Sequence, residues 1–274
     1  MSNRIEGLNV HQEKFMDTFR RLTYRHQRWE VWSDFVSMTA IAIVNAVDKA
    51  HFETREARYM AIINRYESQE QKLFQKLFHI VVAALEAEPE QDFLGDLFMK
   101  LELSNHWKGQ FFTTYQISRL IAEIQSVDLE QLIEQRGHIS INDPACGAGA
   151  LLIAFANSCR AKGINYQQHV LFVAQDIDNT AAMMCYIQLS LLGCPGYIVV
   201  ANTLAHPDTG DLTSDNVWLT PFYFSKVWHW RRVFQSIDTL INQSTPKKAA
   251  VVQELMAPQK EEEPIYITEQ LTLF

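Results

Sequence analysis

A glycine-rich segment between a short strand-like run and an apolar helix constrains the fold of this chain more than any other feature. The strand-like run covers residues 139–141, the segment runs from Asn142 to Gly149, and residues 150–160 have the apolar pattern of a helix. Glycines at such a junction allow a tight turn and bring bare main chain close to a ligand. The order of strand, turn and helix predicts a nucleotide-type fold with a small polar or charged cofactor at the turn.

A second strand and helix follow the first pair, and their order predicts how the strands are joined. Residues 170–174 have the apolar pattern of a strand, residues 175–179 form an acidic turn, and residues 180–192 have the pattern of a helix. A third strand pattern follows at residues 197–201. Strands that alternate with helices of this length favour parallel pairing through crossover helices. We therefore expect an α/β domain built on a parallel sheet.

The chain before this domain has a different pattern. Residues 10–101 follow the apolar spacing of helices and show hardly any strand pattern. Asp92 stands where it can cap the last of these helices. We expect a helical N-terminal domain over residues 1–106 and the α/β domain over residues 107–243. The spacing i, i+3, i+4, i+7 is clear at Tyr59, Ile62, Ile63 and Tyr66.

Composition limits the environment of the chain. A hydrophobic content of 47% and a charged content of 20% are typical of a globular protein with a packed core. The most apolar stretch, residues 35–47, is too short to span a bilayer, and no signal sequence is evident, so we expect a cytoplasmic protein without a membrane partner. The four cysteines form no CxxC pair, which argues against a zinc site or a disulfide framework.

The glycine-rich segment also resembles a known family. Residues 142–152 are similar to motif I of the N6-adenine DNA methyltransferases, especially the modification subunits of type I restriction systems. Residues 109–115 resemble the GQFxTP segment of that family, with Thr114 in place of the usual proline. The resemblance implies the Rossmann-like fold of S-adenosylmethionine-dependent methyltransferases, with S-adenosylmethionine as cofactor and DNA as substrate. It also implies that Phe112 and Thr113 help hold the methionine end of the cofactor.

Further candidate contacts lie at the ends of the second and third strands. An acidic side chain at the end of the second strand can accept hydrogen bonds from both ribose hydroxyls, and Asp176 is the candidate. Residues 201–204 stand where the family has a Gly-Asp-x-Leu turn near the adenine ring, so the resemblance implies that Asn202 contacts the base. The remaining candidates for cofactor binding are Asp143, Pro144, Ala145, Gly147, Gly149 and Ile177.

The catalytic tetrapeptide of the family is not intact. In this family Asn/Asp-Pro-Pro-Tyr/Phe accepts hydrogen bonds from the poorly nucleophilic adenine N6 and stacks on the extruded base. Neither NPP nor DPP occurs in the sequence, and the nearest match is residues 219–222, with Pro221 and Phe222 as degenerate candidates. The leucine that begins this match cannot accept a hydrogen bond. We expect reduced or absent catalysis unless Asp215 or Asn216 reaches the reacting nitrogen.

Charge and length point to partners. The net charge of -8 argues against a strong unaided grip on DNA, because Lys and Arg supply most contacts to phosphates. The sequence after residue 222 is also too short for the separate target-recognition domain that these enzymes require. The resemblance therefore implies a partner, either a specificity subunit or a methyltransferase subunit.

The last thirty residues divide into two parts. Residues 244–269 are mostly polar, contain several prolines and lack periodicity, which predicts a flexible linker. Residues 270–274 resemble the bacterial sliding-clamp-binding peptide, whose Gln enters a small polar pocket while its Leu-Phe pair enters an apolar groove. The alternative is a last strand, begun by residues 265–267, that docks on the sheet. The implied clamp contacts are Gln270, Leu271, Leu273 and Phe274.

Three hypotheses of function remain open from the sequence. In the first, a bacterial or mobile-element protein related to restriction-modification systems binds S-adenosylmethionine near DNA, with reduced or no catalysis, and the clamp brings it to replication forks. In the second, the chain is an active adenine methyltransferase subunit with an altered site that needs a partner to recognise DNA. In the third, the α/β fold is a relic and the chain is a non-catalytic clamp-binding interaction module.

Overall fold

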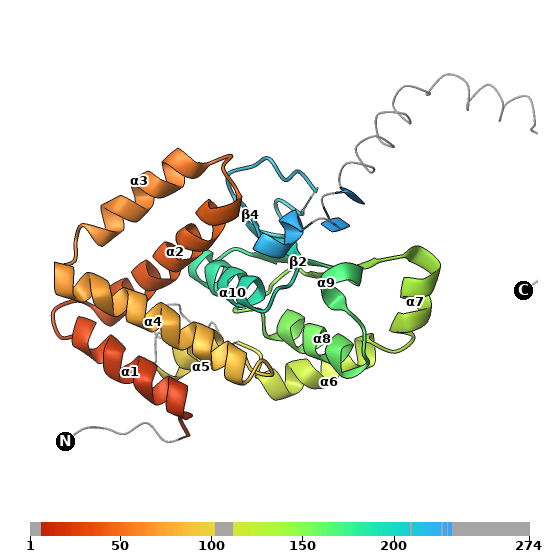
Figure 1. The fold of residues 1–274 in the computed structure, drawn as a ribbon, viewed down its shortest axis with the longest axis horizontal. Coiled ribbons are helices and arrows are strands. Elements are labelled where there is room, and N and C mark those ends of the chain that lie inside the picture. Colours follow the sequence, from red (N-terminus) through yellow and green to blue (C-terminus); the bar gives the residue numbers. More distant parts are fainter. Residues whose placement is uncertain (1–6, 102–111, 209, 226, 229, 232–274) are drawn as a thin grey trace, which may run out of the picture. The chain divides into compact units, whose positions relative to one another are not determined.

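The computed structural model describes residues 7–101, 112–208, 210–225, 227–228 and 230–231. The chain divides into two compact units, residues 1–229 and residues 230–274. All helices and strands named below lie in the first unit (Figure 1). The boundaries expected near residues 106 and 243 fall outside the described residues, as do the linker and the peptide 270–274.

Five helices occupy the region where the apolar spacing predicts helices. They are α1 (Val10–Leu22), α2 (Arg28–Val47), α3 (Phe52–Ile63), α4 (Ser68–Ala87) and α5 (Phe93–Lys100). The predicted cap is confirmed, because the Asp92 side chain accepts a hydrogen bond from the main-chain N–H of Gly95, 2.9 Å away. By length and composition α2 could cross a membrane, but 67% of its apolar window is buried, as in the core helix of a globular protein.

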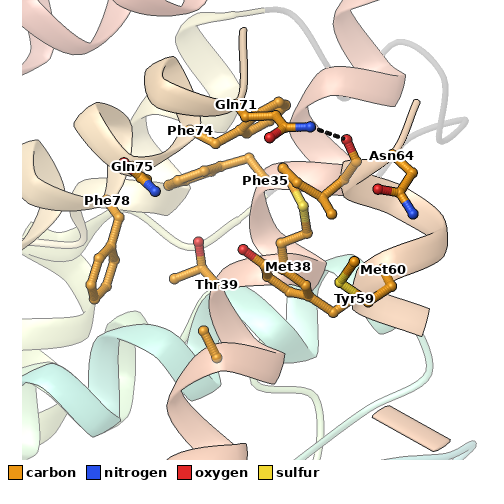
Figure 2. A pocket seen from close by; sticks show the side chains of 12 residues that line it. Phe35, Met38, Thr39, Tyr59, Met60, Asn64, Gln71, Phe74, Gln75 and Phe78 are labelled. Atoms are coloured by element: carbon orange, nitrogen blue, oxygen red, sulfur yellow. Dashed lines mark hydrogen bonds between the residues drawn. The ribbon is translucent and has the colours of Figure 1, made fainter. Parts of the chain in front are cut away.

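A cavity of about 410 Å³ lies among α2, α3 and α4 (Figure 2). Its lining residues include four aromatic rings and two methionines, and none of them carries a charge. On its rim, the Gln71 amide donates to the main-chain oxygens of Ile63 and Tyr66 at 3.2 and 3.0 Å. The aromatic lining residues are Phe35, Tyr59, Phe74 and Phe78.

A four-stranded sheet follows, in the order β1-β2-β3-β4. The strands are β1 (Ile139–Asp143), β2 (Val170–Asp176), β3 (Gly196–Val200) and β4 (Val217–Leu219). Neighbours β1, β2 and β3 pair in parallel, which confirms the predicted α/β arrangement, whereas β4 runs antiparallel to β3. The other elements are α6 (Tyr115–Gln125), α7 (Leu129–Arg136), α8 (Ala150–Ala161), α9 (Tyr166–His169), α10 (Asn179–Leu191) and the 3-10 turn η2 (Pro221–Phe224).

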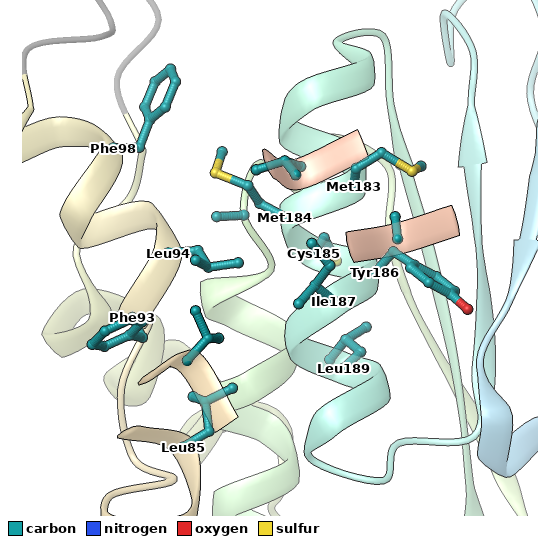
Figure 3. Close-up of a cluster of buried hydrophobic side chains, with 14 of the residues drawn as sticks. Leu85, Phe93, Leu94, Phe98, Met183, Met184, Cys185, Tyr186, Ile187 and Leu189 are labelled. Atoms are coloured by element: carbon teal, nitrogen blue, oxygen red, sulfur yellow. The ribbon is translucent and has the colours of Figure 1, made fainter. Parts of the chain in front are cut away.

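Helix α10 joins the helical region to the sheet. It is apolar on every side, as expected of a helix without a solvent face, and residues 180–190 are all buried. Figure 3 shows Met184 of α10 beside Leu94 and Phe98 of α5. One continuous apolar core therefore extends from α1 through α5 and α10 to the strands.

Candidate functional site

The turn between β1 and α8 depends on two glycines. Gly147 has φ +54° and Gly149 has φ +95°, a left-handed conformation that residues with a Cβ adopt only at a cost. A Cβ on Gly147 would lie 2.9 Å from the Phe112 ring, and a Cβ on Gly149 would lie 2.8 Å from Sγ of Cys185. The main chain of the turn is therefore closely packed against Phe112 and Cys185.

Asp176 ties this turn to the end of β2. Its Oδ2 accepts a hydrogen bond from the main-chain N–H of Gly147 at 2.8 Å, and its Oδ1 accepts one from the main-chain N–H of Asp178 at 2.9 Å. The residue is only 8% exposed. An ionised carboxylate has about four lone-pair sites, so the two hydrogen bonds leave each oxygen of Asp176 able to accept another.

The turns after β1, β2 and β3 meet at one edge of the sheet, where the carboxyl ends of the parallel strands lie. The main-chain N–H of Cys146 donates to the carbonyl of Gln175 at 3.0 Å. The Thr203 hydroxyl donates to the carbonyl of Pro144 at 2.5 Å, and the main-chain N–H of Ala201 donates to the carbonyl of Asp176 at 3.0 Å. The candidate residues on all three turns are therefore brought together.

The candidates after β2 and β3 include two exposed residues. Ile177, directly after β2, is 69% exposed, which is unusual for an isoleucine beside a buried strand. Asn202, after β3, is also exposed, and its Oδ1 accepts a hydrogen bond from the main-chain N–H of Leu204 at 3.0 Å. The side-chain oxygen of Asn202 thus stabilises the turn in which the residue lies. No described residue accepts a hydrogen bond from the side-chain NH2 group of Asn202.

A small cavity opens beside the glycine-rich turn, and we call it the turn cavity. It has a volume of about 180 Å³. Its lining residues among those described include Asp92, Ser118 and Ile121, which the sequence did not indicate as site residues. Five sequence-predicted residues also line it, namely Phe112, Thr113, Asp143, Ala145 and Gly147. Gln110 and Phe111 of the upstream segment lie outside the described residues.

Two carboxylates line the turn cavity. Burial raises the pKa of the Asp143 carboxyl, the hydrogen bond from the main-chain N–H of Ala145 opposes this shift, and the charge of Asp176 adds to it. Burial also raises the pKa of the Asp92 carboxyl, against hydrogen bonds from Gln188 and from Gly95. None of the described lining residues is Lys, Arg or His, so the cavity favours a cationic group.

Gln188 connects Asp92 to the glycine-rich turn. It is fully buried in α10, and its Nε2 donates to Oδ1 of Asp92 at 2.7 Å and to the carbonyl of Ala148 at 2.9 Å. Its Oε1 accepts from the main-chain N–H of Leu94 at 3.1 Å. The signal in the sequence is an amide within a mostly apolar, buried helix, a pattern that requires buried partners.

The degenerate tetrapeptide lies elsewhere on the sheet. Because β4 is antiparallel to β3, Leu219 pairs with Tyr197 at the beginning of β3, so Pro221 and Phe222 follow at the edge opposite the glycine-rich turn. The Thr220 hydroxyl accepts from the main-chain N–H of Gly196 at 2.9 Å, which fixes the peptide there. The structure therefore does not bring these two degenerate candidates to the glycine-rich turn.

The two upstream alternatives have other partners. Oδ1 of Asp215 lies 2.9 Å from Nδ1 of His51, within hydrogen-bonding distance. Asn216 donates from its side chain to the carbonyl of Val200 at 3.3 Å, at the carboxyl edge of the outer pair β3 and β4. Neither lines the turn cavity. Among the described residues no cluster of His, Cys, Asp and Glu is suited to a metal ion, and the four cysteines are free and buried.

Comparison with known proteins agrees with this geometry. Residues 91–268, more than half of the chain, match the family model described as N-6 DNA Methylase. The chain is also similar to a type I restriction enzyme MjaIX methylase subunit of Methanocaldococcus jannaschii, with 25% identity over 132 residues. That alignment covers 48% of this chain and 22% of the archaeal subunit.

Proposed function

This chain belongs to the N-6 DNA methylase family, and from that premise we propose that it binds S-adenosylmethionine at the turn between β1 and α8. The observation that carries the proposal is the convergence of three strand-end turns on Asp176 and Gly147. The turn cavity, at about 180 Å³, is smaller than the roughly 300–1,000 Å³ of a pocket for a whole ligand. It therefore takes one end of the cofactor, while the nucleoside lies along the open turns.

The residues of the turns suit the parts of this cofactor. Asp176 has lone pairs left for the ribose hydroxyls. The exposed Ile177 offers an apolar surface for the adenine ring, and Asn202 offers amide hydrogens for its edge. Asp143 and the other carboxylate of the turn cavity suit the positively charged methionine end. When bound, the cofactor supplies an electrophilic methyl group.

Calorimetry tests the proposed binding. Wild-type protein should bind S-adenosylmethionine, and Asp176→Ala should abolish the binding, because it removes the ribose acceptor and the anchor of the Gly147 N–H. Affinity that is unchanged in Asp176→Ala would contradict the proposal. Absence of binding by the wild-type chain would favour the third hypothesis, in which the α/β fold is a relic.

We further propose that the chain alone transfers no methyl group to DNA. The tetrapeptide 219–222 lacks a polar first residue, and its position beside the start of β3 is far from the carboxyl edge of the sheet. Neither NPP nor DPP, which supply the amide and carbonyl acceptors for adenine N6 in this family, occurs in the sequence. Incorporation of tritium from labelled cofactor into duplex DNA, above the level of Asp176→Ala, would refute this proposal.

A partner subunit would supply the DNA recognition and the methyl transfer that the chain alone is proposed to lack. The archaeal relative is named as a methylase subunit of a type I restriction enzyme, and this chain spans 22% of its length. We propose that a second subunit supplies DNA recognition, because a net charge of -8 opposes direct binding to phosphates. Methyl transfer that appears only after addition of such a subunit would favour the second hypothesis.

The peptide 270–274 is proposed to bind the bacterial sliding clamp. The support is its sequence, Gln-Leu-Thr-Leu-Phe, after a polar stretch that contains Pro258 and Pro264. A pull-down with purified clamp should retain the wild-type chain and lose a chain without residues 270–274. Retention of the truncated chain would remove the basis for this proposal.

A further inference from the structure

We propose that Asp92, at the start of α5, binds the ammonium group of S-adenosylmethionine from the side of the turn cavity opposite the β1 turn. This inference rests on the proposed cofactor binding and adds a residue that lies outside the glycine-rich segment. Asp92 and Asp143 both line the turn cavity, although they are fifty residues apart in the chain. The ligand group that both can share is a cation.

Asp92 is buried and only partly hydrogen-bonded. The residue is 7% exposed. Its Oδ1 accepts two hydrogen bonds, from the main-chain N–H of Gly95 at 2.9 Å and from Nε2 of Gln188 at 2.7 Å. Its Oδ2 accepts none from the residues that the structure describes. Oδ2 therefore keeps its lone pairs for a ligand that donates a hydrogen bond.

The chemistry of the free oxygen selects the ammonium over the sulfonium. The cofactor carries both cations at the same end, but only the ammonium has N–H groups to donate. A charge-assisted hydrogen bond from N–H to carboxylate is roughly twice as strong as a neutral one. The Asp92 oxygen therefore gains more from the ammonium, and the described residues that line the turn cavity include no Lys, Arg or His. Lys100 lines a neighbouring cavity together with Asp92, and it pairs there with Asp96.

Local geometry holds the Asp92 carboxylate in place. A Cβ on Gly95 would lie 2.1 Å from Oδ2 of Asp92, so only a glycine leaves room for this oxygen. Gln188 fixes the other oxygen and also donates to the carbonyl of Ala148 in the glycine-rich turn. The carboxylate is thus oriented before a ligand arrives, which reduces the entropic cost of binding.

Three ligands and two substitutions test the inference by calorimetry. S-adenosylmethionine has both cations, S-adenosylhomocysteine has the ammonium alone, and 5′-methylthioadenosine has neither. Asp92→Asn keeps an oxygen for Gly95 and Gln188 but removes the negative charge. It should weaken binding of the first two ligands at least about tenfold, which corresponds to the loss of one charge-assisted hydrogen bond. Binding of 5′-methylthioadenosine should stay within about twofold.

Two further variants are controls that distinguish a loss of binding from a folding defect. Asp92→Ser keeps a helix-capping oxygen without the charge and should repeat the result of Asp92→Asn. Asp96→Asn removes a negative charge from the same helix at an exposed residue that pairs with Lys100, and it should leave all three affinities unchanged. Thermal unfolding of each variant shows that it is folded.

The outcomes separate this inference from the proposal on which it rests. A loss of affinity that is equal for all three ligands would mean that Asp92 acts only through the helix cap, and it would overturn the inference. Unchanged affinity for S-adenosylmethionine in both Asp92 variants would overturn it as well. If the wild-type chain binds none of the three ligands, the proposed cofactor site itself is wrong and the inference falls with it.

Discussion

Asp176 accepts a hydrogen bond from the main-chain N–H of Gly147 across 2.8 Å, so one side chain at the end of β2 fixes the glycine-rich turn. Asp176→Asn turns Oδ2 into a nitrogen that faces this N–H, since Oδ1 is held by Asp178. Two hydrogen-bond donors that face each other leave the main-chain N–H without an acceptor, which costs about 1–3 kcal/mol. We predict a loss of that size in the free energy of unfolding, measured by denaturant titration, and at least tenfold weaker cofactor binding.

Asp178→Asn is the matched control for this substitution. Asp178 lies two residues away and caps α10 by accepting from the main-chain N–H of Ala181, which an asparagine also does. It should change stability and cofactor affinity much less than Asp176→Asn does. Equal effects of the two substitutions would mean that the negative charge at this edge matters, and that the Gly147 contact does not.

Gly149→Ala should destabilise the fold for two reasons, the backbone conformation and the steric contact of the added Cβ, which can be measured separately. The left-handed backbone costs about 1–2 kcal/mol for a residue with a Cβ, and the contact of that Cβ with Cys185, at 2.8 Å, adds about 1–3 kcal/mol for overpacking. Gly163→Ala carries only the first term, because its φ is +74° and nothing lies within 4 Å of its Cβ. Chemical denaturation of both variants measures the difference, and equal losses would contradict the packing contact.

Thr220→Val should reduce stability without changing cofactor affinity. The substitution keeps the shape of this fully buried residue but leaves the main-chain N–H of Gly196 without its acceptor, a cost of about 1–3 kcal/mol. Cofactor affinity should be unchanged, because Thr220 lies at the sheet edge opposite the turn. The exposed Thr213→Val is the control, with an effect within about 0.5 kcal/mol. A selective loss of cofactor binding in Thr220→Val would place the degenerate tetrapeptide back at the site.

The buried carboxyl of Asp92 gives the apo protein a defined pH dependence. Burial raises its pKa above the unfolded value of about 3.9. The folded chain then holds this proton more tightly, so the stabilising contribution is complete below the unfolded pKa and is lost as the pH rises through the folded pKa. Asp92→Asn does not titrate. The wild type should therefore lose stability relative to Asp92→Asn as the pH rises from about 4, when stability is measured as the free energy of unfolding.

Urea titrations at a series of pH values, without ligand, measure this difference. A difference that stays flat would mean that the pKa of Asp92 is the same in both states. A difference that grows with pH would reverse the sign and would indicate a carboxylate stabilised in its charged form.

The elements of the α/β part were predictable because their signals are local. The strand patterns at 139–141, 170–174 and 197–201 correspond to β1, β2 and β3, and the helix expected at 180–192 is α10. The Asp92 cap also followed from the sequence, since a cap needs only a polar residue before an apolar run. Periodicity within ten or twenty residues decides such features.

The position of the tetrapeptide was not predictable from the sequence. The strand β4 is only three residues long, too short for a periodic pattern, and its direction is decided by its pairing with β3. The position of Asp92 at the turn cavity was equally unpredictable, because a helix cap is sufficient to explain an aspartate at that position. Contacts between distant residues, such as Gln188 with Asp92, depend on packing that no local pattern encodes.

The single amide of Gln188 serves both α5 and the glycine-rich turn, which means that neither can shift without breaking a buried hydrogen bond. The matched family region begins at residue 91, one residue before Asp92. A fragment cut at that boundary would keep both ends of the bridge but would strip α5 and α10 of the helices that cover them. We therefore expect the proposed ligand affinity to depend on the first hundred residues as much as on the motif, and domain dissection should preserve them.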